Sequence, residues 1–355
     1  MKLLELHILQ SFPVTCLNRD DVGAPKSAVF GGTPRARVSS QCWKRAIREE
    51  AKTQDGSLFA ANRTRYVVTQ LETALQKEGC LEEKKADYAL LLADAIGKAD
   101  DKKEGAVKTL LFFSPNEFEA ISEAFLATEN LEEMDEKALK KAAEKARKAV
   151  KANEKVKDAA DVSIFGRMVA DDHSLMVEGA GMFSHALSTH KVSTEIDFFT
   201  AVDDVAPEDS EGAGHIGTLE FNSACYYRYI ALNLDLLADE EHLGHFSDEE
   251  LKAVVDAFVR ASILSVPGAR KNSMMGFNPP EYVLGTIREG QPVSLANAFE
   301  SPVVGKGKGF VAPSIQALEE KFQWMEKTYG FTSIVEKKIP TIGMDEFCKE
   351  LVEHV

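Results

Sequence analysis

The stretch FGGTPRARVSSQCWKRAIREEA, residues 30–51, places a short strand directly before an amphipathic helix and decides the local fold. Its Gly31–Gly32 pair can adopt positive φ, which lets the backbone approach a ligand and present N–H groups to an anion. Arg35 and Arg37 are two positions apart, as residues on one face of a strand are. We therefore expect both guanidinium groups to project from the same side.

The helix that follows is predicted over about Gln41–Ala51, with Ser39 or Ser40 as its N-cap. Trp43 and Ile47 lie on one side of this helix and are expected in the core. The opposite side carries a polar stripe at i, i+3, i+4 and i+7, made of Gln41, Lys44, Arg45 and Arg48. This spacing fits a track for a phosphate backbone, and the helix N-terminus adds to the preference for anions.

The charge around this helix is opposite in sign to that of the whole chain. Residues 18–48 hold seven Lys or Arg and two Asp, whereas the formal net charge of the 355-residue chain is -15. Such a basic cluster on an acidic protein indicates a polyanionic partner. The alternative is that the cationic helix face is only solvated surface.

Composition limits the class of protein. A chain of 355 residues with 44% hydrophobic residues can form one elaborated domain or two. No stretch approaches the roughly 18–20 apolar residues that span a bilayer, and the N-terminus carries Glu5 where a signal peptide would be apolar. The five cysteines are scattered without a C-x-x-C pair, as in reduced cytoplasmic proteins, so we expect a soluble cytoplasmic protein.

Strands and helices alternate along the chain, with one helical block set apart, which predicts the α+β class. Tyr227 and Tyr229 alternate on a predicted central strand, where they either stack on RNA bases or pack in the core. Met168, beside Arg167, faces either a ligand or the core. The predicted elements are an opening strand, a helical region over about 63–157, a strand at Ile164–Val169, a hairpin followed by a central strand over 192–236, a helix at Asp248–Ser265, a strand at Tyr282–Ile287 and a helix at Ser314–Tyr329.

Several motifs together resemble one known family, the CasC-type (Cse-four) backbone subunit of the type I-E CRISPR Cascade complex. The resemblance runs in order from the first strand to about Glu326, and it is poor over the helical region and the extreme C-terminus. The motifs are Cys16–Asp21, Phe30–Gly32, Arg35–Gln41, Asp197–Asp204, Phe277–Pro279 and Ser294–Glu300.

The resemblance implies an RRM-like (ferredoxin-like) palm, inserted helical fingers and a β-hairpin thumb. The expected divisions are residues 1–52 and 162–355 for the palm, 53–161 for the helical insertion, and about 192–222 for the thumb. Subunits of this family assemble head to tail along a CRISPR RNA and present it for pairing with target DNA. The thumb of each, here with Phe199 and Thr200, folds over the RNA of its neighbour.

The resemblance and the basic cluster together give a set of expected RNA-binding residues. Met168 matches a residue that wedges near a displaced base, and the others are polar or cationic. The set is Asn18, Arg19, Lys26, Arg35, Arg37, Ser39, Ser40, Gln41, Lys44, Arg45, Arg48, Arg167, Met168, Arg270 and Lys271. A subunit that holds a guide through phosphates and sugars needs no catalytic residue, metal or cofactor, and we expect none. The expected partners are CRISPR RNA, target DNA, further copies of the chain and other Cascade subunits, with no membrane.

Two other classes of function remain open from the sequence. A CRISPR endoribonuclease would need a metal site or a general base, yet His242 and His245 lie in a polar loop and are interpreted as a solvated turn. The adjacent acid pairs, Asp20–Asp21, Asp171–Asp172 and Asp203–Asp204, do not chelate a metal from a strand, and the first is expected to pair with Arg19 or a neighbouring subunit. A protein scaffold without RNA leaves the basic cluster unexplained.

Overall fold

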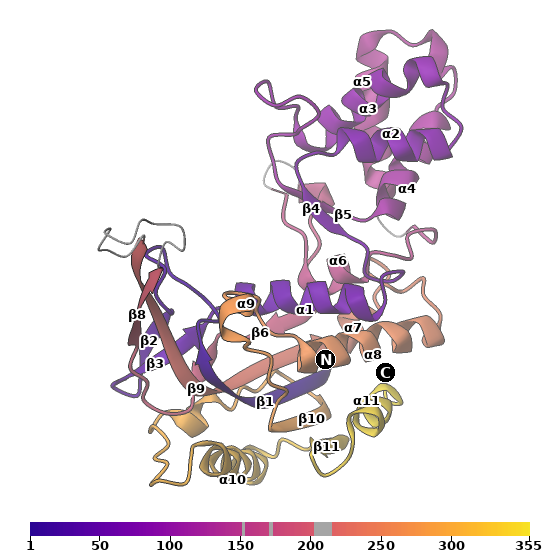
Figure 1. Cartoon of the computed structure of the whole chain (residues 1–355). Coiled ribbons are helices and arrows are strands. Elements are labelled where there is room, and N and C mark those ends of the chain that lie inside the picture. The colour runs from indigo at the N-terminus through magenta and orange to yellow at the C-terminus, as the bar shows by residue number, and fades with distance from the viewer. Residues whose placement is uncertain (151–152, 170–172, 202–214) are drawn as a thin grey trace, which may run out of the picture.

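The computed structural model describes residues 1–150, 153–169, 173–201 and 215–355. Figure 1 shows a body built on a large sheet, with a block of helices standing on one side and a hairpin rising on the other. The α+β class is therefore confirmed. None of the helices within these ranges is long and apolar enough to cross a bilayer.

One antiparallel sheet forms the body, and β1 (Lys2–Thr15) and β9 (His215–Asn233) lie at its centre. The strand order is β11-β10-β1-β9-β7-β3-β2, with β6 and β8 also paired to β9. The other strands of this sheet are β2 (Ser27–Phe30), β3 (Thr33–Val38), β6 (Gly181–Phe183), β7 (Ala186–Ser188), β8 (Glu195–Ala201), β10 (Tyr282–Glu289) and β11 (Val335–Ile339). This order brings the basic segment at β2 and β3 beside the base of the β8–β9 hairpin.

One face of the sheet is covered by α1 (Ser40–Gln54), α8 (Asp248–Leu264) and α11 (Met344–Val352). Alternate residues of β1, among them Leu4, Leu6 and Ile8, are fully buried against the apolar sides of these helices. Ser247 and Glu250 form the predicted capping box of α8, which begins and ends within one residue of its predicted bounds.

The other face is also covered, by α10 (Val311–Tyr329) and the short helix η4 (Ala296–Phe299). Tyr227 and Tyr229 are only 2% and 6% exposed beneath them, so the tyrosines of the central strand pack in the core and do not present a stacking surface. Tyr229 donates a hydrogen bond to the buried carboxylate of Glu5, which also forms an ion pair with Arg288. The carboxylate of Glu5 is thus satisfied inside the protein.

The helical block has its own hydrophobic core. It contains a two-stranded sheet of β4 (Asn62–Thr64) and β5 (Leu111–Phe113) next to the body. Its helices are α2 (Val68–Lys77), α3 (Glu82–Gly97), α4 (Pro115–Leu126), η1 (Leu131–Glu133), α5 (Glu136–Ala146) and η2 (Arg147–Val150). Lys157 joins the block to the body, because its Nζ lies 2.7 Å from Oε2 of Glu250 and donates to the carbonyl of His245.

The predicted strand at Ile164–Val169 is wrong. Residues Ala160–Phe165 form helix α6, and Gly166, with φ of 78°, turns the chain into a single bridge between Arg167 and Val177. Every residue of α6 is buried, so the segment has no exposed side and shows no helical periodicity in its sequence. The remaining short helices are η3 (His173–Leu175), α7 (Leu234–Leu237) and α9 (Lys271–Met274).

Candidate nucleic-acid interface

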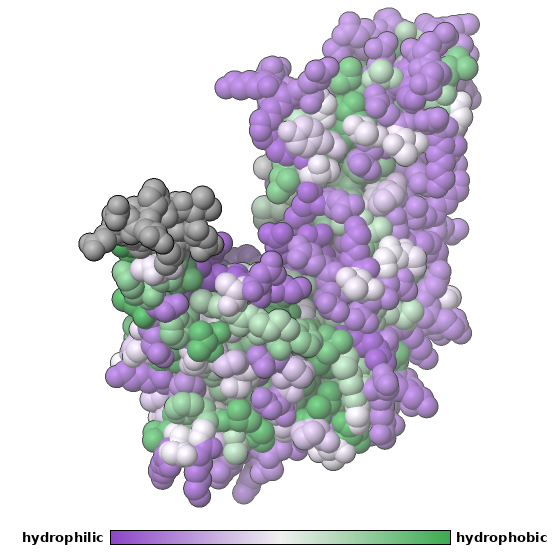
Figure 2. Space-filling model, in the orientation of Figure 1, coloured by the Kyte–Doolittle hydropathy of each residue, from purple (hydrophilic) through white to green (hydrophobic). Residues whose placement is uncertain are grey.

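Helix α1 carries the predicted polar stripe on the side that faces away from the sheet. Oγ of Ser39 accepts a hydrogen bond from the backbone of Cys42 and caps the helix, while Trp43 and Ile47 are buried beneath it. Gln41 and Arg45 are exposed, and Lys44 and Arg48 are half-buried. Figure 1 shows α1 lying between the β8–β9 hairpin and the helical block, on the floor of the concave side visible in Figure 2.

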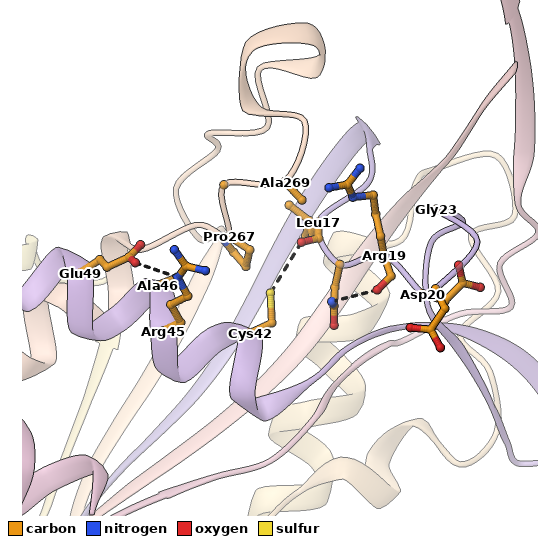
Figure 3. A pocket seen from close by; sticks show the side chains of 13 residues that line it. Leu17, Arg19, Asp20, Gly23, Cys42, Arg45, Ala46, Glu49, Pro267 and Ala269 are labelled. Carbon is orange, nitrogen blue, oxygen red and sulfur yellow. Dashed lines mark hydrogen bonds and ion pairs between the residues drawn. The ribbon is translucent and has the colours of Figure 1, made fainter. Parts of the chain in front are cut away.

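A hollow of about 700 Å³ lies at the N-terminal half of this stripe. Figure 3 shows Arg19, Arg45 and Glu49 around it, with the segment at Pro267–Ala269 closing one side. Nε of Arg45 lies 2.8 Å from Oε1 of Glu49, and this partner raises the pKa of the guanidinium. Arg19 is exposed and makes no ion pair within the described residues.

The acid pair in this loop has a structural role that we did not predict. Oδ1 of Asp20 accepts hydrogen bonds from the backbone N–H groups of Val22 and Ala24, at 3.0 and 2.9 Å, and so forms the turn. Within the described residues Asp20 forms no ion pair with Arg19, and pairing of this acid pair with a neighbouring subunit stays a prediction. Oδ1 of Asn18 accepts from the N–H of Ser39, which ties the loop to the start of α1.

A second group of cations lies where α1 meets the helical block. The guanidinium carbons of Arg48 and Arg63 lie 5.4 and 5.1 Å from the centre of the Phe112 ring, and Nζ of Lys44 lies 5.1 Å from that of Phe183. Burial and the charge of Arg63 lower the pKa of Lys44. We did not predict Arg63 or Phe112. The available signal was that Arg63 and Arg65 are two positions apart, as residues on one face of a short strand are.

Met168 lies at the edge of a hollow of about 750 Å³ that Arg63, Phe112 and Met176 also line. The Met168 side chain is 79% exposed, so it does not fill the core. This hollow adjoins the Arg48 and Arg63 pair through their shared neighbour Phe112. The exposed apolar surface at Met168 therefore lies next to the cations of α1 and β4.

Arg35 is not at the surface, contrary to our prediction. It is fully buried, and its side chain donates hydrogen bonds to Oγ1 of Thr33 and to the carbonyls of Ser188 and Phe299, all within 2.9 Å. Burial lowers its pKa, and the nearby Glu300 opposes this effect. Arg35 therefore holds together three segments of the body and has no donor directed at a ligand.

Arg167, like Arg35 and the capping residue Ser39, is a predicted RNA-binding residue that is buried. It is 4% exposed and forms a buried ion pair with Glu117 at 2.6 Å. It also donates to the carbonyls of Leu175 and Phe112. Its role is to join α4 and β5 of the helical block to the chain after α6.

The other predicted residues have mixed placements. Arg37 is half-buried and donates to the carbonyl of Ser27, and Ser40 and Lys26 are also half-buried. Arg270 begins α9 with φ of 53°, and Lys271 beside it is exposed. Figure 1 shows α9 on the same side of the body as α1.

The β8–β9 hairpin exposes apolar side chains. Phe199 and Thr200 lie on β8, all of whose residues are exposed, and the ring of Phe199 packs over Gly217 of β9. Part of the predicted thumb, with Asp203–Asp204, and the pair Asp171–Asp172 lie outside the described residues. Ile196, Phe198 and Ile216 are 69%, 62% and 58% exposed, an amount of apolar surface typical of an interaction site.

The described residues contain no group of three or more His, Cys, Asp and Glu side chains that could hold a metal ion. His242 is buried and its pKa is lowered by desolvation, so the interpretation of this residue as part of a solvated turn is wrong. His245 Nε2 lies 2.9 Å from the carbonyl oxygen of Val156. Both histidines belong to the junction between the helical block and the body.

Comparisons with known proteins give consistent results. Residues 4–347 match the model of a family described as CT1975-like protein. A chain of a "CRISPR RNA-guided surveillance complex, pre-nicking" is 27% identical with a TM-score of 0.81, and the match covers 99% of both chains. A chain of a "CRISPR RNA-guided surveillance complex" has the same fold, with 23% identity, a TM-score of 0.63 and coverage of 99% and 98%. No curated protein matches the chain.

Proposed function

Because the chain belongs to the CT1975-like protein family and is a CRISPR-associated (Cas) subunit, we propose that it binds CRISPR RNA along helix α1. The observation that carries this proposal is the outward cationic stripe of α1, from Gln41 to Arg48, on an acidic protein. Such a surface binds phosphates without reading bases. A guide must be held in this way, because its base edges have to remain available for pairing.

The finer features of the proposal come from the resemblance described above. The sheet body corresponds to an RRM-like palm, the helical block to fingers and the β8–β9 hairpin to a thumb that contacts the next copy. Copies joined head to tail form an open filament along the RNA, because such an interface does not close on itself. The proposed setting is a cytoplasmic, type I-E Cascade complex that pairs its guide with target DNA, and the subunit itself performs no catalysis.

Co-expression with a CRISPR repeat-spacer transcript tests the proposal. We expect the purified protein to elute as a particle many times the mass of its 39.0 kDa chain, with an absorbance ratio at 260 and 280 nm that indicates RNA. A nucleic-acid-free monomer that cleaves added RNA would favour a nuclease instead. An oligomer that survives RNase unchanged would favour a protein scaffold.

Replacing Lys44, Arg45 and Arg48 with Ala tests the surface itself. Each lost phosphate contact lowers the slope of log affinity against log salt by about 0.7, so we expect the triple variant to lose about 2 from the slope for single-stranded RNA. Fluorescence anisotropy of labelled RNA at several salt concentrations measures this slope. Lys349→Gln on α11 is the control, because Lys349 is an exposed cation of the C-terminal helix, and it should leave the slope unchanged.

A further inference from the structure

Three cations from helix α1 and strand β4 lie near one another, with Arg48 and Arg63 over the ring of Phe112 and Lys44 over that of Phe183. Lys44 and Arg48 belong to α1, whereas Arg63 lies on β4 of the helical block. Both guanidinium groups lie over Phe112, and the Nη1 of Arg48 donates to the carbonyl of Ala61, next to β4. The middle of α1 is thereby held against the first strand of the block.

The positive charges of this group repel one another. Burial and the charge of Arg48 lower the pKa of Arg63, and burial and the charge of Arg63 lower that of Lys44. A cation with a lowered pKa is less stable in its charged form, so an added anion would stabilise the charged forms of Lys44 and Arg63. Groups with perturbed pKa values cluster at functional sites.

No carboxylate neutralises the group at the surface. Within the described residues, none of the three cations makes an ion pair, although other cations of the helical block do, such as Arg65 with Asp100 at 2.5 Å and Lys155 with Glu123 at 2.5 Å. The acid that interacts with Arg48 and Arg63 is Asp161, which is 1% exposed and has an Oδ2 without a hydrogen-bond partner. The outward side of the group is therefore available to an anion from solution.

We propose that Arg63 completes a phosphate-binding subsite with Lys44 and Arg48, and that this subsite takes a phosphodiester of single-stranded RNA. The guanidinium groups supply fork-shaped donors for phosphate oxygens, and stacking on Phe112 orients them. Arg63 also lines the hollow at Met168, so a phosphate here places the adjoining nucleotide beside exposed apolar surface. The inference rests on the proposed function. It means that the helical block contacts the RNA directly through Arg63.

Arg63→Gln tests this subsite in the full chain. Arg63 is exposed and makes no ion pair in the described residues, so the variant should fold, which far-UV circular dichroism and the thermal midpoint check. We expect the salt slope for labelled single-stranded RNA to fall by about 0.7, equally for two unrelated sequences. Lys349→Gln should again leave the slope unchanged.

Comparison with the triple variant of α1 separates the two proposals. An unchanged slope in Arg63→Gln together with a lowered slope in the triple variant overturns the subsite and leaves the proposed function standing. An unchanged slope in both variants overturns the proposed function as well. A rise in the thermal midpoint with inorganic phosphate that Arg63→Gln abolishes, without any change in its RNA slope, assigns the site to free phosphate and overturns the RNA subsite.

Discussion

Strand β3 and helix α1 follow each other in the chain, but Arg35 of β3 is buried whereas the arginines of α1 reach the surface. Arg35 on β3 is enclosed by backbone carbonyls from two distant segments, whereas Arg45 and Arg48 on α1 face outward. Gly31 is part of the reason, because a Cβ there would overlap the carbonyl of Glu300, so glycine permits the close approach that buries Arg35. The basic cluster therefore contains a structural cation as well as cations that reach the surface.

The largest effect is expected at Arg35. Replacing it with Met leaves the carbonyls of Ser188 and Phe299 buried without their charged donor, which should lower the free energy of unfolding by about 3–5 kcal/mol. Urea denaturation measures the loss. Arg37→Met, two residues along the same strand, should lower the free energy of unfolding by at most about 1 kcal/mol. Arg37 is half-buried, and its hydrogen bonds to the carbonyl of Ser27 and to His185 are exposed to solvent.

The RNA measurement sharpens the same contrast. Arg35→Met, measured where it is folded, should keep the salt slope of RNA binding, because its donors are all used inside the protein. A slope reduced by about 0.7 with a normal unfolding free energy would show that the guanidinium of Arg35 reaches the RNA. The distinction between the two regions would then be wrong.

An effect of opposite sign, and no larger, is expected at Asp161. Desolvation raises its pKa from 3.8 to about 7, and the charge of Arg48 opposes this increase. The unfolded chain releases the proton near pH 4 and the folded chain near pH 7, so the charged carboxylate progressively reduces stability as the pH rises through this window. Since one pKa unit corresponds to about 1.4 kcal/mol, Asp161→Asn should gain up to about 4 kcal/mol at pH 8.

The test is the pH dependence of the difference between the variant and the natural chain. Asn keeps an acceptor for the N–H of Val162, and the groups that act on this position are Arg48, Arg63, Glu117 and the backbone of Ala61. The stability gain should be smallest near pH 4 and grow by about 2–3 kcal/mol between pH 5 and pH 8. A gain that does not change with pH would mean that the pKa of Asp161 is not raised.

Features set by neighbouring residues could be predicted from the sequence. The Ser39 cap, the buried side of α1 and the capping box of α8 depend on residues within one or two turns, and all three are confirmed. The central position of β9 was also predicted from a run of β-branched and aromatic residues. The outward polar stripe of α1 could therefore be predicted from the spacing of its own residues.

Features set by distant partners could not be predicted. The acceptors of Arg35 lie 153 and 264 residues away, and the ion-pair partner of Arg167 lies 50 residues away. An arginine at a strand position looks the same in the sequence whether carbonyls or phosphates satisfy it. Arg63 was missed for the same reason, since its association with Arg48 and Phe112 exists only after the block packs against α1.

The smallest effect on stability, and the finest test of the α1 surface, is expected at Glu49. Its carboxylate is half-exposed and pairs with the 74% exposed side chain of Arg45 at 2.8 Å, so Glu49→Gln should change the unfolding free energy by no more than about 0.5 kcal/mol. The variant removes a competitor for the guanidinium, and a phosphate can then take its place. Because Arg45 already counts among the proposed phosphate contacts, we expect tighter RNA binding at each salt concentration with the salt slope unchanged. Weaker binding would mean that Glu49 orients Arg45 for RNA, and unchanged binding would mean that Arg45 does not contact the RNA.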